Sequence, residues 1–199
     1  MDTAFKLDKQ VSSVVKTSFF HLRLLAKIKP YLSRNDLEKV IHAFISSRLD
    51  YCNSLYAGID QSQLRRLQLI QNAAARLLTG KKKRDHITPV LASLHWLPVR
   101  YRIDFKILMY AFKIRNGMAP PSLADLISNY SPARALRSAD QLLLSEFPTN
   151  RVTRGDRAFA AAAPRLWNNL PIHIRAAQSI AIFKSLLKTY FFSLAFSDI

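Results

Sequence analysis

Four adjacent cations are the residues whose types and spacing best suit binding chemistry in this sequence: Lys81, Lys82, Lys83 and Arg84. Such a run raises the local positive potential, which suits contact with phosphate groups or recognition as a nuclear import signal, and it is also typical of a solvated turn. The run follows a helical pattern and lacks the Walker spacing, so no nucleotide-phosphate loop is predicted. Nucleic-acid contact is the favoured hypothesis among the three.

A second basic group consists of arginine alone: Arg134, Arg137, Arg151, Arg154, Arg157 and Arg165. The planar guanidinium binds phosphates through two parallel hydrogen bonds and stacks on bases, so this group predicts recognition of a nucleic-acid backbone. The alternative is that several of these arginines pair with Asp140, Glu146 and Asp156. Three carboxylates against six arginines still leave a net positive charge.

No catalytic residue is predicted. A two-metal polymerase or nuclease needs clustered carboxylates, and the sequence has no Asp-Asp pair. Asp50 is more typical of a helix cap or of a pair with a neighbour such as Arg48. The dipeptide at Asp85 and His86 could imitate a base with its orienting carboxylate, but no local motif marks a nucleophile, so a loop histidine near phosphate or capping a helix is favoured.

No metal or cofactor is predicted either. No histidine is followed three or four residues later by a second ligand, the spacing that places two ligands on one helical face; the five are His21, His42, His86, His95 and His173. Cys52 is the only cysteine, which excludes a cysteine-based zinc site and an intrachain disulfide.

The overall charge points to a polyanionic partner. Thirty Lys and Arg against thirteen Asp and Glu give +17, and the excess is spread over both halves of the chain. RNA, DNA or an RNA-DNA hybrid is the leading candidate, ahead of an anionic membrane. The apolar runs are too short to span a bilayer, and charged residues interrupt the N-terminus, so no signal peptide is predicted. We therefore expect a nuclear or cytoplasmic location rather than secretion.

The elements that position these residues are predicted to be mainly α-helical. One helix ends just before Pro30, and a second, about 24 residues long, begins at a Ser33 cap and runs towards Gly58. A third has Asp60 as its cap, with Gln63 completing a capping box, and Gly80 as its terminator. Residues 1–80 therefore predict three antiparallel helices. The cations off the apolar stripe of the third helix should face solvent or a ligand; they are Arg65, Arg66 and Arg76.

The second part, residues 81–199, is predicted to be a helical extension with the basic loop at its start. Its predicted helices cover residues 87–94, 98–117, 123–127, 158–166 and a final segment after a Ser179 cap. Strand character is confined to residues 142–152, which predict at most one small hairpin. Trp96 and Trp167 are each predicted to be core residues rather than base-stacking platforms.

An ordered series of five segments carries a family resemblance: His42–Ser54 (HAFISSRLDYCNS), Leu67–Arg76 (LQLIQNAAAR), Arg84–Val99 (RDHITPVLASLHWLPV), Arg102–Lys106 (RIDFK) and Leu166–Pro171 (LWNNLP). Together they resemble the C-terminal part of non-LTR (LINE-type) retrotransposon reverse transcriptases, a family of RNA-directed DNA polymerases. The resemblance covers nearly the whole chain.

The resemblance implies a thumb for residues 1–80, which in such polymerases holds the template-primer duplex by its backbone, and the C-terminal extension for residues 81–199. The family's endonuclease and the palm aspartates that bind the metals have no counterpart here, so the chain resembles a truncated fragment without polymerase activity of its own. Some members end in a Cys/His zinc knuckle, which the single cysteine excludes.

Two functional hypotheses follow from the sequence. The first is a non-catalytic fragment that binds nucleic acid through basic residues, mainly at phosphates. The second is a helical protein-interaction module, or an orphan fragment that docks on a missing polymerase palm domain and leaves a former domain interface exposed.

Overall fold

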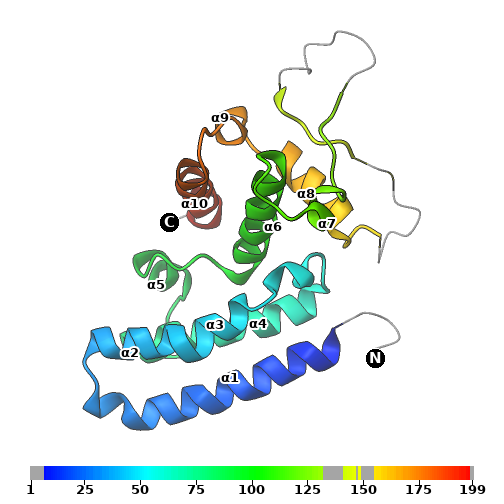
Figure 1. Ribbon diagram of the computed structural model, residues 1–199. Coiled ribbons are helices and arrows are strands. Elements are labelled where there is room, and N and C mark those ends of the chain that lie inside the picture. The colour runs from blue at the N-terminus through cyan, green and yellow to red at the C-terminus, as the bar shows by residue number, and fades with distance from the viewer. Residues whose placement is uncertain (1–6, 132–140, 147, 149–154, 198–199) are drawn as a thin grey trace. The chain divides into compact units, whose positions relative to one another are not determined.

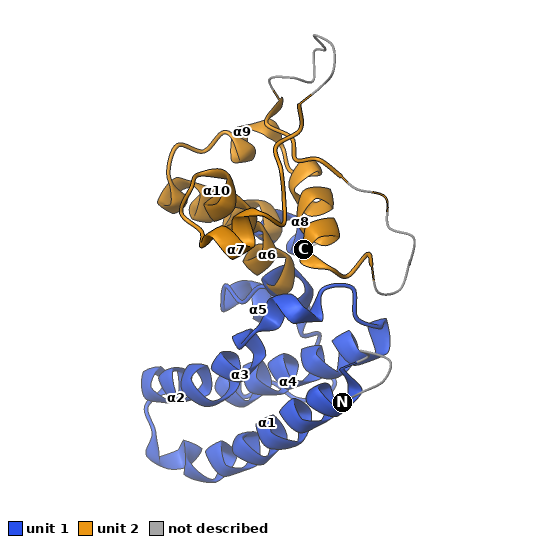
Figure 2. Ribbon diagram, turned by 45° about the vertical axis from the view of Figure 1, so that its right-hand side comes forward, with its two compact units in different colours: residues 1–102, 192–199 blue, residues 103–191 orange. Residues whose placement is uncertain are grey.

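The computed structural model confirms the mainly α-helical fold (Figure 1) and describes residues 7–131, 141–146, 148 and 155–197. The α-helices, in chain order, are α1 (Asp8–Ile28), α2 (Arg34–Ile41), α3 (Ser47–Asp50), α4 (Gln61–Thr79), α5 (Thr88–Ser93), α6 (Val99–Arg115), α7 (Pro121–Ala124), α8 (Phe159–Asn168), α9 (Ile172–Arg175) and α10 (Ile180–Phe196). The chain divides into two compact units, one of residues 1–102 and 192–199 and one of residues 103–191 (Figure 2).

Helix α1, the arm formed by α2 and α3, and helix α4 alternate in direction. Helices α1 and α4 therefore run parallel to each other, and the arm of α2 and α3 runs antiparallel to both (Figure 1). The N-terminal ends of α1 and α4 are joined by Gln63 Nε2, which donates to Asp8 Oδ1 at 2.6 Å. Their C-terminal ends are joined by Lys29 Nζ, which donates to the Leu77 carbonyl at 2.6 Å. Two polar contacts therefore fix the register of α4 against α1.

Local helix signals are confirmed at several boundaries. Helix α1 ends at Ile28, two residues before Pro30, and passes into a 3-10 turn. Ser33 Oγ accepts from Asp36 N at 3.1 Å and caps α2. Gly80 ends α4 with φ 73°, a left-handed conformation that glycine adopts without a Cβ clash. Ser179 Oγ accepts from Ile182 N at the start of α10.

The predicted length of the second helix and the predicted capping box of the third are wrong. Helical structure continues from α2 through a π segment (His42–Ser46) and α3 but stops at Asp50. Tyr51 is extended and Cys52 has φ 49°, a conformation that no glycine or proline signalled. The Asp60 side chain makes no cap hydrogen bond; Gln63 N donates to the Asp60 carbonyl at 2.9 Å, and the Gln63 side chain contacts α1. Tertiary contacts override the local signal at both places.

The core of the first unit lies between α1, α2 to α3 and α4, where Val11, Ile41, Ile45, Leu67 and Ile70 are almost fully buried. The segment that follows α4 packs on this core and is held there by the buried side-chain amide of Gln71. Gln71, 3 % exposed, donates from Nε2 to the Leu97 carbonyl at 2.8 Å, and Gln68 Oε1 accepts from Val99 N at 2.9 Å.

The second unit packs α8, α9 and part of α10 around α6. Phe112 of α6 stacks on Phe183 of α10 at a ring distance of 4.3 Å, and Trp167 of α8 stacks on the same ring at 5.6 Å. Trp167 Nε1 also donates to the Leu142 carbonyl at 2.8 Å. Helices α5, α6 and α8 confirm those predicted near their positions, although α8 continues to Asn168, two residues beyond the end predicted at residue 166.

The predicted hairpin lies partly outside the described residues. In its described part, Leu144 forms an isolated antiparallel bridge with Asn129, and no strand is present in the described residues. The Asn168 side chain satisfies both backbone groups of Leu144, accepting from N and donating to O at 2.9 Å each. This segment is therefore held by a helix rather than by a partner strand within it. The domain boundary predicted after residue 80 stays a prediction.

Candidate nucleic-acid interface

The basic loop, defined as Lys81–Arg84, forms an ordered turn directly after α4. Asp85 N donates to the Lys82 carbonyl at 3.1 Å, and Asp85 Oδ2 accepts from Lys82 N at 2.8 Å. This reciprocal pair closes the turn and leaves Lys83 and Arg84 at its tip. All four side chains of the loop are exposed, and within the described part of the chain none of them forms an ion pair.

Arg76, in the last turn of α4, donates hydrogen bonds that hold the basic loop in place. Its Nε donates to the Lys82 carbonyl and its Nη2 to the Asp85 carbonyl, both at 3.3 Å. The guanidinium therefore fixes the turn through neutral carbonyls, which leave its positive charge uncompensated. Arg76 adds to the potential of the loop while it holds the loop in shape.

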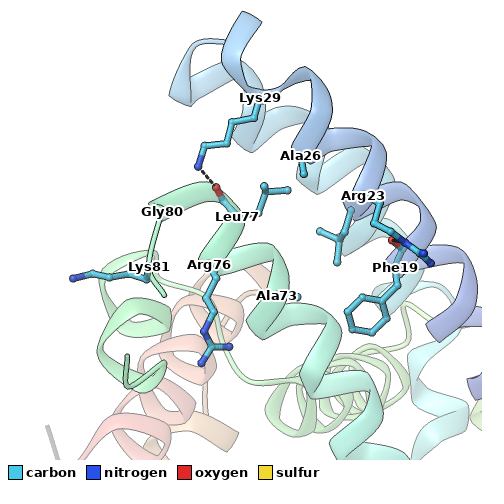
Figure 3. A pocket seen from close by; sticks show the side chains of 10 residues that line it. Phe19, Arg23, Ala26, Lys29, Ala73, Arg76, Leu77, Gly80 and Lys81 are labelled. Atoms are coloured by element: carbon cyan, nitrogen blue, oxygen red, sulfur yellow. Dashed lines mark hydrogen bonds between the residues drawn. The ribbon is translucent and has the colours of Figure 1, made fainter. Parts of the chain in front are cut away.

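A pocket of about 390 Å³ lies beside the loop, between α1 and the C-terminal half of α4 (Figure 3). Its apolar wall consists of Phe19, Leu22, Ala26, Ala73 and Leu77. Four cations line it as well: Arg23, Lys29, Arg76 and Lys81. Gly80 completes the lining, which contains no acidic side chain. We call this site the α1–α4 pocket.

The four cations of the pocket differ in how firmly they are held. Lys29 and Arg76 donate to backbone carbonyls of α4 and of the loop, so their positions are set. Arg23 donates only from Nε, to the Phe19 carbonyl at 3.2 Å, which leaves both terminal nitrogens available. Lys81 is exposed and makes no side-chain hydrogen bond in the described structure. Arg23 and Lys81 are therefore the two that can turn towards a ligand.

The arginines predicted at the start of α4 lie away from this site. Arg65 is exposed, and from Arg65 to Gly80 the helix extends roughly 22 Å. Arg66 Nη1 donates to Gln63 Oε1 at 2.8 Å and its Nη2 to Ser12 Oγ at 3.0 Å. Of the three arginines predicted on α4, the structure brings only Arg76 to the basic loop.

Most of the second arginine group lies outside the described residues, namely Arg134, Arg137, Arg151 and Arg154. Of the two described members, Arg157 is half-buried and Arg165 Nη2 lies 3.2 Å from Asp156 Oδ1. Glu146, predicted as another possible partner, accepts from Asn168 Nδ2 at 2.7 Å.

The residues considered for catalysis have structural contacts. Asp50 pairs with Arg102, not with the neighbour Arg48 that the sequence suggested, because α6 brings the Arg102 guanidinium to the end of α3. Arg48 Nη2 lies 3.3 Å from His21 Nε2 instead. Among the described residues, no three His, Cys, Asp or Glu side chains come together as a possible metal site. Trp96 and Trp167 are buried, as predicted.

Sequence reasoning predicted only Arg76 and Lys81 of the pocket as site residues and missed its α1 side, including Phe19, Arg23 and Lys29. The sequence assigned no role to Arg23, and nothing local linked α1 to α4. The available signal was a basic side chain near the C-terminal end of each helix, Lys29 after α1 and Arg76 in α4, where the helix dipole favours cations. That signal indicates stabilised helix ends but not that the two ends meet.

Comparison of the chain with protein-family models, with curated proteins and with solved structures gave no match. The helices of the described residues include none that is both long enough and apolar enough to cross a membrane.

Proposed function

We propose that this chain binds nucleic acid through its phosphates and corresponds to the thumb and C-terminal extension of a LINE-type reverse transcriptase. The observation that carries the binding proposal is the group of cations without carboxylate partners that gathers where α1, α4 and the basic loop meet. Like charges this close repel one another, and a polyanion that displaces their counterions offsets that cost. The family assignment is supported by the ordered motif series.

The proposed ligand is RNA, DNA or an RNA-DNA hybrid, contacted with little reading of sequence. The exposed basic loop offers the charged groups of lysine and arginine side chains rather than a helix that could enter a groove of the duplex. Such charged groups bind backbone phosphates without distinguishing the bases. The chain is proposed to act without catalysis of its own, because the sequence has no adjacent aspartates such as those of the family's palm.

Salt dependence of binding tests this proposal. Affinity for a 20-base-pair RNA-DNA hybrid is measured by fluorescence anisotropy between 50 and 200 mM salt. Each neutralised phosphate contributes about −0.9 to the slope of log affinity against log salt concentration. Replacing all four residues of the basic loop with alanine should make the slope shallower by about 2 to 4, because up to four phosphate contacts are lost.

A matched variant removes the same charge elsewhere. Lys9 and Lys16 of α1 and Lys184 and Lys188 of α10 are exposed helix residues that do not belong to the loop, and their replacement with alanine should change the slope by less than about 1. Equal slope changes in the two variants would show that net charge alone drives binding. A wild-type slope near zero would refute phosphate contact.

An exposed apolar stripe favours a second candidate function, docking on a protein partner such as a missing polymerase palm. The stripe consists of Phe20, Leu24, Ile28 and Tyr31, spaced at helical intervals along and just beyond α1, together with Phe44. The His21 ring contacts both the α1 residues of the stripe and Phe44, with ring distances of 5.6 Å to Phe20 and 5.2 Å to Phe44. Apolar side chains gathered on one face are typical of an interaction surface.

Light scattering after size exclusion tests this second candidate. An exposed apolar stripe should make the isolated chain associate with itself, and replacing Phe20 and Leu24 with serine and glutamine should restore the monomer. Replacing Leu55 and Leu69, which are more exposed than Phe20 and Leu24 but lie outside the stripe, with the same polar residues should not. A wild-type chain that is a clean monomer at high concentration argues against docking through this stripe.

A further inference from the structure

We propose that the α1–α4 pocket binds one unstacked nucleotide of a single strand, with the base against the apolar wall and the adjoining phosphate at the cationic rim. This inference rests on the proposed nucleic-acid binding and adds a ligand class that phosphate contact alone does not require. The loop alone would serve any polyanion. The pocket beside it combines apolar and cationic side chains, which suits a ligand with both an apolar face and an anionic group.

The composition of the pocket selects an anion that also has an apolar face. Phe19, Leu22 and Leu77 offer apolar surface, and no carboxylate of the lining competes for the cations. Inorganic phosphate would leave the apolar wall in contact with water, and an intact duplex keeps its bases stacked inside. An unstacked base covers such a wall and brings its phosphate with it, as in proteins that bind single strands through aromatic side chains and a basic groove.

The arrangement of side chains assigns a role to each end of the pocket (Figure 3). Phe19 and Arg23 lie one helical turn apart on α1, and the Arg23 Nε bond to the Phe19 carbonyl keeps the guanidinium close to the turn that carries the ring. This end suits a base, which stacks on an aromatic ring or on a guanidinium plane. Lys29 and Lys81 lie towards the other end, where α4 passes into the basic loop, and this end suits the phosphate.

Small residues keep the pocket open. Ala26 of α1 and Ala73 of α4 both line it, and a longer side chain at either position would occupy the space of a base. Gly80 contributes no side chain, and a Cβ built there would meet no atom within 4 Å. The pocket is therefore bounded by residues whose size allows a ligand between the helix ends.

Base-dependent binding tests the inference with the full chain. The probes are a 12-nucleotide single-stranded DNA and the same strand with one central abasic site, and affinities are measured by anisotropy at one salt concentration. Loss of one stacked base should weaken wild-type binding at least about fivefold. The Ala26→Leu variant, altered at an exposed position that tolerates the larger side chain, should bind the two strands equally.

Controls match the size change and provide a second route. Ala181→Leu makes the same change at an exposed position of α10 and should keep the fivefold difference. Arg23→Gln should reduce the difference as well, whereas Arg34→Gln, which removes an exposed arginine at the start of α2, should not. Thermal unfolding is measured for each variant to establish that it is folded. If either Ala26→Leu or Arg23→Gln does not fold, the other variant still tests the inference.

Other results would overturn the inference in distinguishable ways. Equal wild-type affinity for the two strands, with the hybrid still bound through the basic loop, would remove the nucleotide from the pocket and leave the proposed function intact. Absence of binding to the hybrid and to both strands would overturn both proposals. Binding of an oligoglutamate peptide to the wild type but not to the pocket variants, together with equal affinity for the two strands, would assign the pocket to acidic protein segments.

Discussion

The pair formed by Asp50 and Arg102 is expected to be a stabilising link between the end of α3 and the start of α6. Arg102 Nε donates to Asp50 Oδ1 at 2.8 Å, and Nη2 donates to Oδ2, so the guanidinium binds the carboxylate through two nitrogens. The Arg102 side chain is 22 % exposed and that of Asp50 is 42 % exposed. The perturbation is a double-mutant cycle built from Asp50→Asn, Arg102→Met and both together.

The expected coupling energy lies between two limits. Exposed ion pairs contribute 0.2 to roughly 1 kcal/mol, whereas a hydrogen bond to a charged group in a protected place contributes about 1.5 to 3 kcal/mol. Because one partner is mostly buried and the geometry is bidentate, we expect about 1.5 kcal/mol of coupling. In a chain of this length that corresponds to a shift in Tm of roughly 3 to 6 °C.

Urea unfolding of the four proteins measures the coupling, and a second cycle with Arg48→Met in place of Arg102→Met provides the control. Arg48 is the sequence neighbour of Asp50, but its guanidinium lies at His21, so its coupling to Asp50 should be near zero. A coupling of Asp50 to Arg102 below about 0.3 kcal/mol, or a larger coupling to Arg48, would refute the reasoning.

Three further substitutions test other parts of the molecule. Gln71→Leu should lower the free energy of unfolding by about 1 to 3 kcal/mol in urea titrations, because the Leu97 carbonyl loses its buried donor; an unchanged midpoint would contradict this. Arg175→Met should raise Tm, since two nitrogens of this buried guanidinium have no partner among the described residues and burial lowers its pKa; a fall in Tm would show that the charge is needed. The hydrogen bond from Ser33 lowers the pKa of Asp36 in the folded chain. Ionised Asp36 therefore stabilises the fold fully above its unfolded-state pKa of about 3.9. This stabilisation is lost as the pH falls through the lower folded-state pKa. Asp36→Asn should therefore lower Tm at pH 7 but have little effect at pH 2, and an equal effect at both would exclude the charge as its cause.

The sequence by itself determined most of the secondary structure. Pro30, Ser33 and Gly80 act within a few residues of their own positions, through a missing donor, a side-chain cap and a left-handed conformation, so their effects can be recognised without knowing the fold. The same is true of the four adjacent cations of the basic loop, whose exposure follows from the cost of burying charge. The burial of Trp96 and Trp167 was also predictable from their apolar surroundings.

Only the tertiary structure decided which long side chains meet. Gln63 was expected to cap its own helix but contacts Asp8, and Asp50 was expected to pair within its own helix but contacts Arg102. Each of these side chains reaches partners on more than one element, and the energies of the alternatives differ by only about a kcal/mol. Helix packing chooses between them, because it places the start of α4 beside the start of α1 and the start of α6 beside the end of α3. The α1–α4 pocket exists for the same reason, since its two walls belong to segments about fifty residues apart in the chain.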